Sequence, residues 1–420
     1  MKNIVTFFLL FIYSNISLAT ITFMVGTGSD TSINGNGKNS TVRSFSKQSL
    51  VFYKPNGLQS AKINVTAQTN TAEENSTGSV YCHNGGSGNS ISAETSAVPD
   101  DNGRSVDGHV LFKTNIDGLY YTIQLKNIWT AYASAQEESI YLNNSMGNAG
   151  NPSKFNMKIT NSDQQHNCDI ATGSIFYKMG GLNYTVSLDF YIDDKFKPLN
   201  NLEVTLPSRN ADYFFHFQNY NTGLTPNYYI NSKFAFSGVK ITLPTCHTAT
   251  VSGDGNSVTK PDSTYIVNMG TYSAGKIKNG ATPIPFTINL SDCIRIEGIE
   301  VKVTSSTVGK NDKTLLANTL SGSSGVASGV GVRIEALPIN GGSAKVLEPN
   351  NATSVFNVSE TEIDQTDPLA VNGGIYNPDN KDIVGTTEAL NFQATLMQDG
   401  NDTITAGQFK ASSIFQITYP

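Results

Sequence analysis

The only tryptophan of the sequence stands where a strand-like segment gives way to polar residues. Trp129 ends the run LYYTIQLKNIW, and Tyr132 follows it in the polar stretch TAYASAQEES. An aromatic ring can cover the apolar face of a sugar, while nearby amides and carboxylates hydrogen-bond to its hydroxyl groups. Trp129 and Tyr132 are therefore candidates for glycan binding. The competing interpretation is that Trp129 packs into a core at the end of its strand.

A second candidate site surrounds a cysteine in the run SDQQHNCD. Gln165, Asn167 and Asp169 place amide and carboxylate groups around Cys168. We expect a polar loop here that a disulfide ties down, and such loops commonly carry binding residues on a rigid scaffold. These three side chains are therefore further candidates for glycan binding. The alternative is an ordinary solvated loop.

The four cysteines favour disulfides over a metal site. They are Cys82, Cys168, Cys246 and Cys293. None of them forms a C-x-x-C pair, and no histidine stands at a zinc-ligand spacing, so we expect no metal. Four cysteines allow three pairings. We favour Cys82–Cys168 and Cys246–Cys293, because each pair then lies within one half of the chain.

The sequence offers no catalytic motif. It contains no G-x-S-x-G, no H-E-x-x-H and no phosphate-binding loop. A secreted carbohydrate-active enzyme, the alternative considered, needs two carboxylates across one site. The acid pairs Glu73-Glu74 and Glu137-Glu138 are adjacent in sequence, so in strands their side chains would point to opposite faces. We therefore predict that the protein is not an enzyme and uses no cofactor.

The first 19 residues have the organisation of a secretory signal peptide. Lys2 precedes an apolar run from Ile4 to Tyr13, and the small residues of SLA end the segment at position 19. The competing interpretation is a short N-terminal anchor. The net charge is −6 and lysines and arginines are scattered, so we expect no nucleic-acid partner.

Alternation of apolar and polar residues recurs through the whole chain. Residues 182–192 (LNYTVSLDFYI), 284–290 (IPFTINL) and 390–396 (LNFQATL) show it. Turns rich in Gly, Asn and Ser separate these segments, and no window keeps a helical period of 3.6 residues. We therefore predict an all-β fold of two β-sandwich domains. The final residues, ASSIFQITYP, alternate in the same way, so their apolar face needs a partner.

Several features follow one another in the second half of the chain. FSGVKITLPTC begins at Phe236, a second cysteine closes GATPIPFTINLSDC, AGQF precedes the last strand, and a tyrosine is penultimate. In these features residues 236–420 resemble the pilin domain of chaperone–usher (type 1-like) fimbriae. The resemblance implies an incomplete immunoglobulin-like sandwich that lacks its last strand.

The resemblance also implies which residues border the open groove of such a domain. Phe409, Phe415, Ile417 and Tyr419 would line it, and the carboxylate of Pro420 would pair with basic residues of a partner. The implied partners are a periplasmic chaperone, the outer-membrane usher and the donor strand of the adjacent fimbrial subunit. The competing interpretation is an ordinary edge strand in a complete sandwich.

The segment that precedes the pilin-like part is too long to be a donor extension. We expect residues 20–235 to form a lectin-like adhesin domain and residues 236–420 to form the pilin domain. This arrangement resembles a two-domain tip adhesin. It implies export through the periplasm to the cell surface, a place at the fimbrial tip, and a host glycan or glycoprotein receptor. The alternative is a structural tip or adaptor subunit without a receptor.

Overall fold

The computed structural model describes the chain from residue 20 onward, with several short gaps. The described residues are 20–39, 48–53, 58, 63–69, 78–86, 90–143, 153–197, 199–220, 227–255, 257–262, 264–321, 324–370, 375–376 and 383–420. The predicted signal peptide lies outside them. Contacts between residues divide the chain into two compact units. Unit 1 comprises Met1–Ser46, Asn64–Tyr191 and Val204–Gly238, and unit 2 comprises Lys47–Ile63, Ile192–Glu203 and Val239–Pro420.

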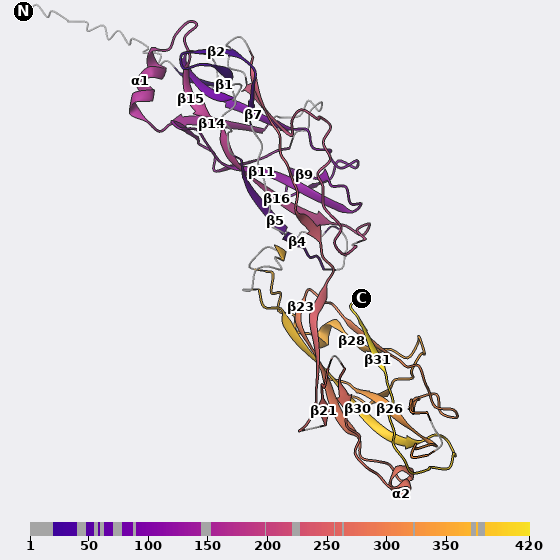
Figure 1. Cartoon of the computed structure of the whole chain (residues 1–420). Coiled ribbons are helices and arrows are strands. Elements are labelled where there is room, and N and C mark those ends of the chain that lie inside the picture. The colour runs from indigo at the N-terminus through magenta and orange to yellow at the C-terminus, as the bar shows by residue number, and fades with distance from the viewer. Residues whose placement is uncertain are drawn as a thin grey trace, which may run out of the picture. The chain divides into compact units, whose positions relative to one another are not determined.

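Unit 1 is built from short and medium-length strands (Figure 1). They are β1 (Ile21–Ser29), β2 (Ser32–Gly35), β3 (Gly37–Asn39), β5 (Ile63–Thr69), β6 (Ser79–Asn84), β7 (Ser90–Thr95), β8 (Ser105–Val106), β9 (His109–Val110), β10 (Phe112–Lys113), β11 (Leu119–Trp129), β12 (Ala133–Ala135), β13 (Ser139–Tyr141), β14 (Ser153–Ile159), β15 (Tyr177–Gly181), β16 (Asn183–Ile192), β17 (Phe215–Tyr220) and β18 (Tyr229–Ser232). One sheet has the order β15-β6-β1-β2. The larger sheet has the order β3-β18-β17-β7-β14-β12-β11-β16-β5, with β10 and β13 also paired to β11.

Aromatic side chains fill the core of unit 1. Tyr121, Phe190 and Phe217 are fully buried, and the ring of Tyr184 lies 5.2 Å from that of Phe217. Every residue of β16 after Asn183 is buried. Both faces of β16 are therefore covered by other parts of the protein.

Residues 162–170 form a helix, α1 (Ser162–Ile170), where the polar sequence predicts a loop. The side chain of Asn161 accepts hydrogen bonds from the backbone N–H groups of Asp163 and Gln164, which is a favoured N-terminal cap. Cys168 is the buried residue of the helix, and its disulfide with Cys82 attaches α1 to β6. The expectation of a loop is wrong because one buried cysteine leaves no apolar period to detect.

Unit 2 is a second β-sandwich. Its elements are β4 (Gln48–Leu50), β19 (Val239–Ile241), β20 (Thr245–Ser252), β21 (Val258–Thr259), β22 (Ile266–Val267), α2 (Ala274–Lys278), β23 (Ile284–Ile294), β24 (Ile299–Thr304), β25 (Leu315–Ala317), β26 (Val330–Leu337), β27 (Lys345–Val346), β28 (Phe356–Val358), the 3₁₀ helix η1 (Glu360–Glu362), β29 (Ile375–Tyr376), β30 (Thr386–Gln398) and β31 (Ile414–Thr418). The larger sheet has the order β20-β23-β30-β26-β25, with β27 added to β26, and the smaller sheet has the order β28-β24-β31.

Both sheets of this sandwich contribute to one core. The ring of Phe392 lies 5.5 Å from that of Phe286 and 6.0 Å from that of Phe356. The second disulfide joins Cys246 of β20 to Cys293 of β23, which are directly opposite in the ladder. The prediction of an all-β fold is confirmed, and both favoured disulfide pairs are formed.

Two segments from the first half of the chain belong to unit 2. Within it, β4 pairs in parallel with β19 and antiparallel with β29. Val51 is buried in a cluster with Ile294 and Leu369. No helix in the described ranges is long and apolar enough to cross a membrane.

Candidate functional site

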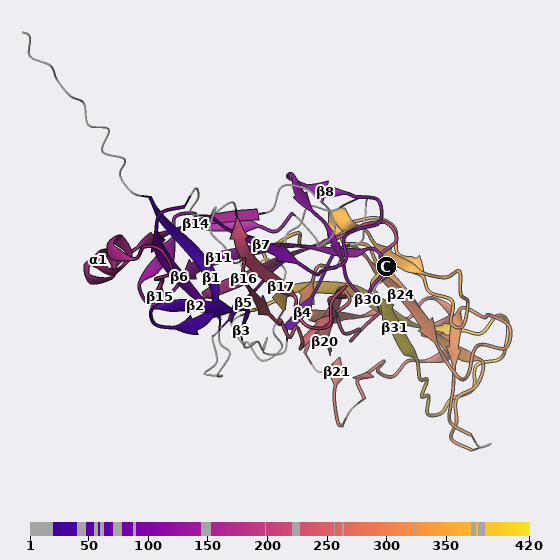
Figure 2. The ribbon, with the colours of Figure 1, turned by 90° about the horizontal axis from the view of Figure 1, so that it is seen from above.

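Each sheet of the unit 2 sandwich ends in a strand that is paired on one side only. β20 pairs with β23, and β31 pairs with β24, beside which it lies in Figure 2. In the part of the chain that the structure describes, neither strand has a second neighbour in its sheet. We call these two strands together the open edge. The unpaired N–H and C=O groups of an edge strand are a template for another strand.

The side chains of β31 and its continuation alternate between half-buried and exposed positions. Phe415, Ile417 and Tyr419 are half-buried and pack against the core, whereas Gln416 and Thr418 are exposed. The predicted alternation of this strand is therefore present. Because the inward side chains remain partly accessible, this side of the core is covered only in part.

Aromatic contacts attach the last strand to the sandwich. The ring of Phe415 lies 5.2 Å from that of Phe392 and 5.9 Å from that of Phe286. Phe409 is half-buried against the same core. On the other strand of the open edge, Val251 of β20 is also half-buried against this core. Apolar surface is thus accessible along both strands.

Tyr419 connects the two strands of the open edge at the disulfide. Burial raises the pKa of its hydroxyl, while a hydrogen bond with the backbone of Cys246 acts in the opposite direction. Pro420, the predicted carrier of a carboxylate contact, is exposed. The geometry is suited to strand addition, in which backbone hydrogen bonds give affinity and alternate side chains meet apolar positions.

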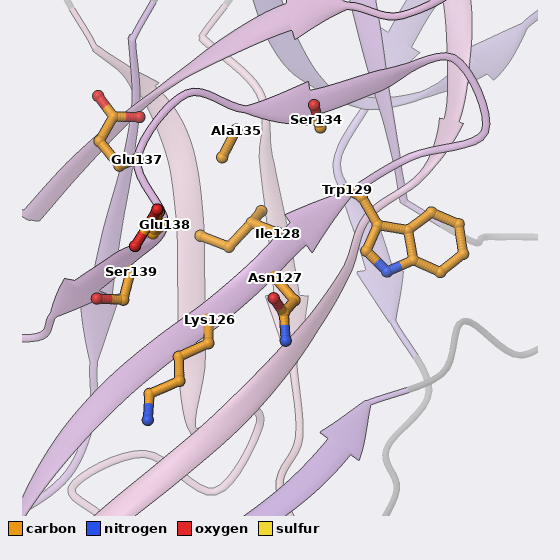
Figure 3. Close-up of a pocket in the computed structure, with 9 residues that line it drawn as sticks. All are labelled: Lys126, Asn127, Ile128, Trp129, Ser134, Ala135, Glu137, Glu138 and Ser139. Carbon is orange, nitrogen blue, oxygen red and sulfur yellow. The ribbon is translucent and has the colours of Figure 1, made fainter.

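A pocket of about 670 Å³ lies in unit 1 where strands separate (Figure 3). β11 pairs with β12 at Trp129 and with β13 at Lys126. Residues 136–138, which connect β12 to β13, lie outside this pairing. Asn127 has a left-handed backbone with φ of 47°, which interrupts the ladder at this point. The lining residues are Lys126, Asn127, Ile128, Trp129, Ser134, Ala135, Glu137, Glu138 and Ser139.

Trp129 presents an accessible aromatic surface at this pocket. Its side chain is 50% exposed, so the interpretation of Trp129 as a core residue is wrong. In Figure 3 its indole lies on the side opposite Glu137 and Glu138. Both carboxylate oxygens of Glu137 accept hydrogen bonds from Asn156, from the backbone N–H and from Nδ2, each at 2.8 Å. Glu137 therefore holds the pocket wall in place.

The other predicted glycan-binding residues lie away from this lining. Tyr132 is 37% exposed in the turn after Trp129 but does not line the pocket. Gln165, Asn167 and Asp169 lie on α1, where Nε2 of Gln165 donates to Oδ1 of Asp169 at 3.0 Å. The structure therefore does not bring the two predicted groups into one pocket.

Sequence reasoning did not identify several polar residues at the pocket. Lys126, Ser134 and Glu138 contribute an amine, a hydroxyl and a carboxylate. They meet because of the irregular backbone at Asn127, and no sequence pattern marks that irregularity. An aromatic face with a few polar groups around it can bind a sugar. Among the described residues, no three His, Cys, Asp or Glu side chains could together hold a metal ion.

The fold of unit 2 defines an immunoglobulin-like module with an open edge. Residues 255–420 match the family model described as Fimbrial protein, so the C-terminal part of the chain is a fimbrial protein domain. The chain matches no curated protein sequence.

Solved structures of fimbrial proteins are similar to this chain at low identity. The CupB6 tip adhesin from Pseudomonas aeruginosa is 12% identical, with 95% of this chain and 94% of that chain covered and a TM-score of 0.36. The CfaE adhesin of CFA/I enterotoxigenic E. coli is 10% identical, with coverage of 92% and 93% and a TM-score of 0.24. The P pilus rod subunit PapA is 13% identical, with coverage of 39% and 98% and a TM-score of 0.26. These TM-scores are too low for a shared fold to follow from them.

Proposed function

We propose that the protein is a fimbrial adhesin in which unit 2 accepts a foreign strand at its open edge and unit 1 binds a host glycan. One observation carries the proposal: Phe415, Ile417 and Tyr419 present half-buried apolar side chains on a strand with one unpaired side. The family match of residues 255–420 supports a fimbrial context for this edge. A periplasmic chaperone would supply the strand first, and the adjacent subunit would replace it at the outer-membrane usher.

The proposal includes the place of the protein in the fibre. Unit 1 would provide the receptor-binding domain predicted for residues 20–235, and unit 2 the pilin domain predicted for residues 236–420, with segments 47–63 and 192–203 added to the latter. The protein would be exported through the periplasm to the fimbrial tip at the cell surface. The Trp129 pocket supports receptor binding over the alternative of an adaptor subunit without a receptor, because its exposed indole has no role in the core.

The strand-accepting role is tested by adding peptides to the full chain. Peptides with alternating apolar residues should raise its urea midpoint. At one hundred times their Kd the free energy of unfolding should rise by about 2.7 kcal/mol. Ile417→Asp should abolish this stabilisation, because it places a charge on the apolar side of the edge. Gln416→Asp, the same change at an exposed neighbour, should leave it intact. Full stability without peptide, and no response to any peptide, would contradict the proposal.

The receptor-binding role is tested on a glycan array with the full chain. We expect Trp129→Ala to abolish binding, because the indole provides the apolar platform of the pocket. Ile170→Ala is the matched control, since Ile170 is also 50% exposed but lies on α1. Binding that survives Trp129→Ala would exclude this pocket. Absence of binding to every glycan by a folded chain would favour the adaptor function.

A further inference from the structure

One face of the large unit 1 sheet carries a continuous row of accessible side chains that begins at the pocket. Trp129 is directly opposite Ser134 on β12, and Ser134 is opposite Lys158 on β14. Two residues away on the same side of β14, Asn156 is opposite Ser90 on β7. Directly opposite residues in a ladder share one face, as do residues two apart in a strand. We call this surface the outer row.

The row continues to an aromatic residue on the next strand. Ser90 is opposite Tyr220 of β17, which extends the outer row across five strands. The residues that alternate with these along their strands point to the other face of the sheet. Ala133, Met157 and Phe217 are among them and are buried, which identifies that face as the core side. With neighbouring strands about 4.8 Å apart, the distance from β11 to β17 is about 19 Å.

Aromatic rings lie at both ends of the outer row. Trp129 stands at the pocket, and at the other end Nζ of Lys154 lies 3.6 Å from the centre of the Tyr220 ring. Lys154 itself shares the face, two residues before Asn156. Between the ends, the row offers the hydroxyl of Ser134 and the amine of Lys158, whereas the amide of Asn156 already accepts from Oγ of Ser90 and donates to Glu137. Aromatic platforms separated by short polar side chains suit a chain of sugar rings better than a single one.

The charges near the row are mixed. Lys154 and Lys158 lie on the face together with Glu94, and Glu137 borders the pocket. Oε1 of Glu94 accepts a hydrogen bond from Nε2 of Gln218, and Glu137 is held by Asn156. No single sign of charge dominates, so a strongly acidic polymer gains little along the row.

We propose that the outer row binds an extended, neutral oligosaccharide, with Trp129 holding one end and the Lys154–Tyr220 pair forming a second contact along the chain. This inference rests on the proposed receptor-binding function and specifies the form of its ligand. The ligand is an oligosaccharide lying across the strands, whose affinity depends on its length. A polypeptide ligand is the other outcome of the test.

The experiment measures binding of the full chain to a monosaccharide and to longer neutral oligomers of the same sugar, for each sugar that the array identifies. Affinity should rise with oligomer length. Tyr220→Ala should reduce affinity for long oligomers about tenfold, the loss expected for one aromatic contact. Trp129→Ala should abolish binding at every length. Tyr177→Ala is the matched control, because Tyr177 is a half-buried tyrosine on β15 of the other sheet.

The outcomes separate this inference from the proposed function. A length-dependent gain that Tyr220→Ala cancels and Tyr177→Ala preserves supports the outer row. Equal affinity for one ring and for many, or a gain that Tyr220→Ala leaves unchanged, overturns the outer row while the receptor function stands. Binding to a glycoprotein that persists after its glycans are removed identifies a polypeptide ligand and overturns the inference. Absence of binding to any saccharide overturns the proposed receptor function itself.

Discussion

The two β-sandwich units differ in how completely they cover their cores. In unit 1, β16 is buried along nearly its whole length. In unit 2, no residue of β31 is fully buried, although Phe415 and Ile417 point toward the core. Both strands alternate apolar and polar residues. Whether their apolar side chains become fully buried depends on whether each strand has a neighbour on both sides. The comparison shows a strand with both faces covered in unit 1 and a last strand in unit 2 whose apolar side chains stay partly accessible.

The two disulfides also differ in the elements that they join. Cys82–Cys168 attaches a helix to a strand across 86 residues of sequence, whereas Cys246–Cys293 joins neighbouring strands across 47. The second bond therefore stabilises one side of the open edge, because β20 has β23 as its single neighbour within the described sheet. The chain contains one tryptophan, which lies in unit 1, so its fluorescence reports on unit 1 alone.

Deleting residues 414–420 should have the largest effect, because it removes β31 from unit 2 and leaves unit 1 unchanged. The loss of β31 removes the contacts of Phe415 with Phe286 and Phe392, and one such aromatic residue typically contributes about 3–5 kcal/mol. Unit 2 should lose its cooperative unfolding transition in far-UV circular dichroism, and the Trp129 fluorescence transition should remain. Replacing exposed Gln416 and Thr418 by Ser is the control. Retention of two transitions in the deletion variant would show that β31 is dispensable.

Removing each disulfide separately should show which unit responds to a strand peptide. Replacing either cysteine pair by serine should lower the free energy of unfolding by about 4–5 kcal/mol, because the unfolded chain regains the entropy that the closed loop restricts. The expected loss is nearly equal for the two loops. A strand peptide should restore stability to the Cys246→Ser, Cys293→Ser variant but not to the Cys82→Ser, Cys168→Ser variant, because the open edge belongs to unit 2. Urea unfolding with and without peptide measures this. Equal rescue of both variants would place the peptide site elsewhere.

Acid titration should give the smallest effect, with opposite signs in the two units. In unit 1, burial would raise the pKa of Asp100, but the hydrogen bonds and charge of Arg104 outweigh it and hold that pKa below its ordinary value. In unit 2, burial raises the pKa of Glu388, against a hydrogen bond from the backbone N–H of Asp364 and with the added charge of that residue.

The signs follow from proton linkage. The contribution of Asp100 is complete above the ordinary aspartate pKa and is lost as the pH falls through the lower folded-state value. The penalty at Glu388 is absent below the ordinary glutamate pKa and grows as the pH rises through the higher folded-state value. Asp100→Asn should therefore flatten the acid side of the unit 1 profile, and Glu388→Gln should raise unit 2 stability at neutral pH. Urea midpoints measured from acid to neutral pH test both variants. A stability profile that either substitution leaves unchanged contradicts the role given to that carboxyl group.

The sequence was sufficient to predict features that depend on local alternation. Phe415, Ile417 and Tyr419 were assigned to one side of a strand because their spacing alone determines the face. The helix α1 was missed because its single buried residue is a cysteine and its start depends on one cap, Asn161. The pocket could not be predicted beyond Trp129, since Lys126 and Ser134 meet through strand pairing and through the unusual backbone of Asn127.

The membership of β4 in unit 2 has a consequence for a nicked chain. If a protease cut the backbone between Gly238 and Val239, the N-terminal fragment would still contain β4, which pairs with β19 and β29, and Val51, which packs with Ile294. The two fragments would remain associated as a complementing pair in a native gel. They would separate only on denaturation.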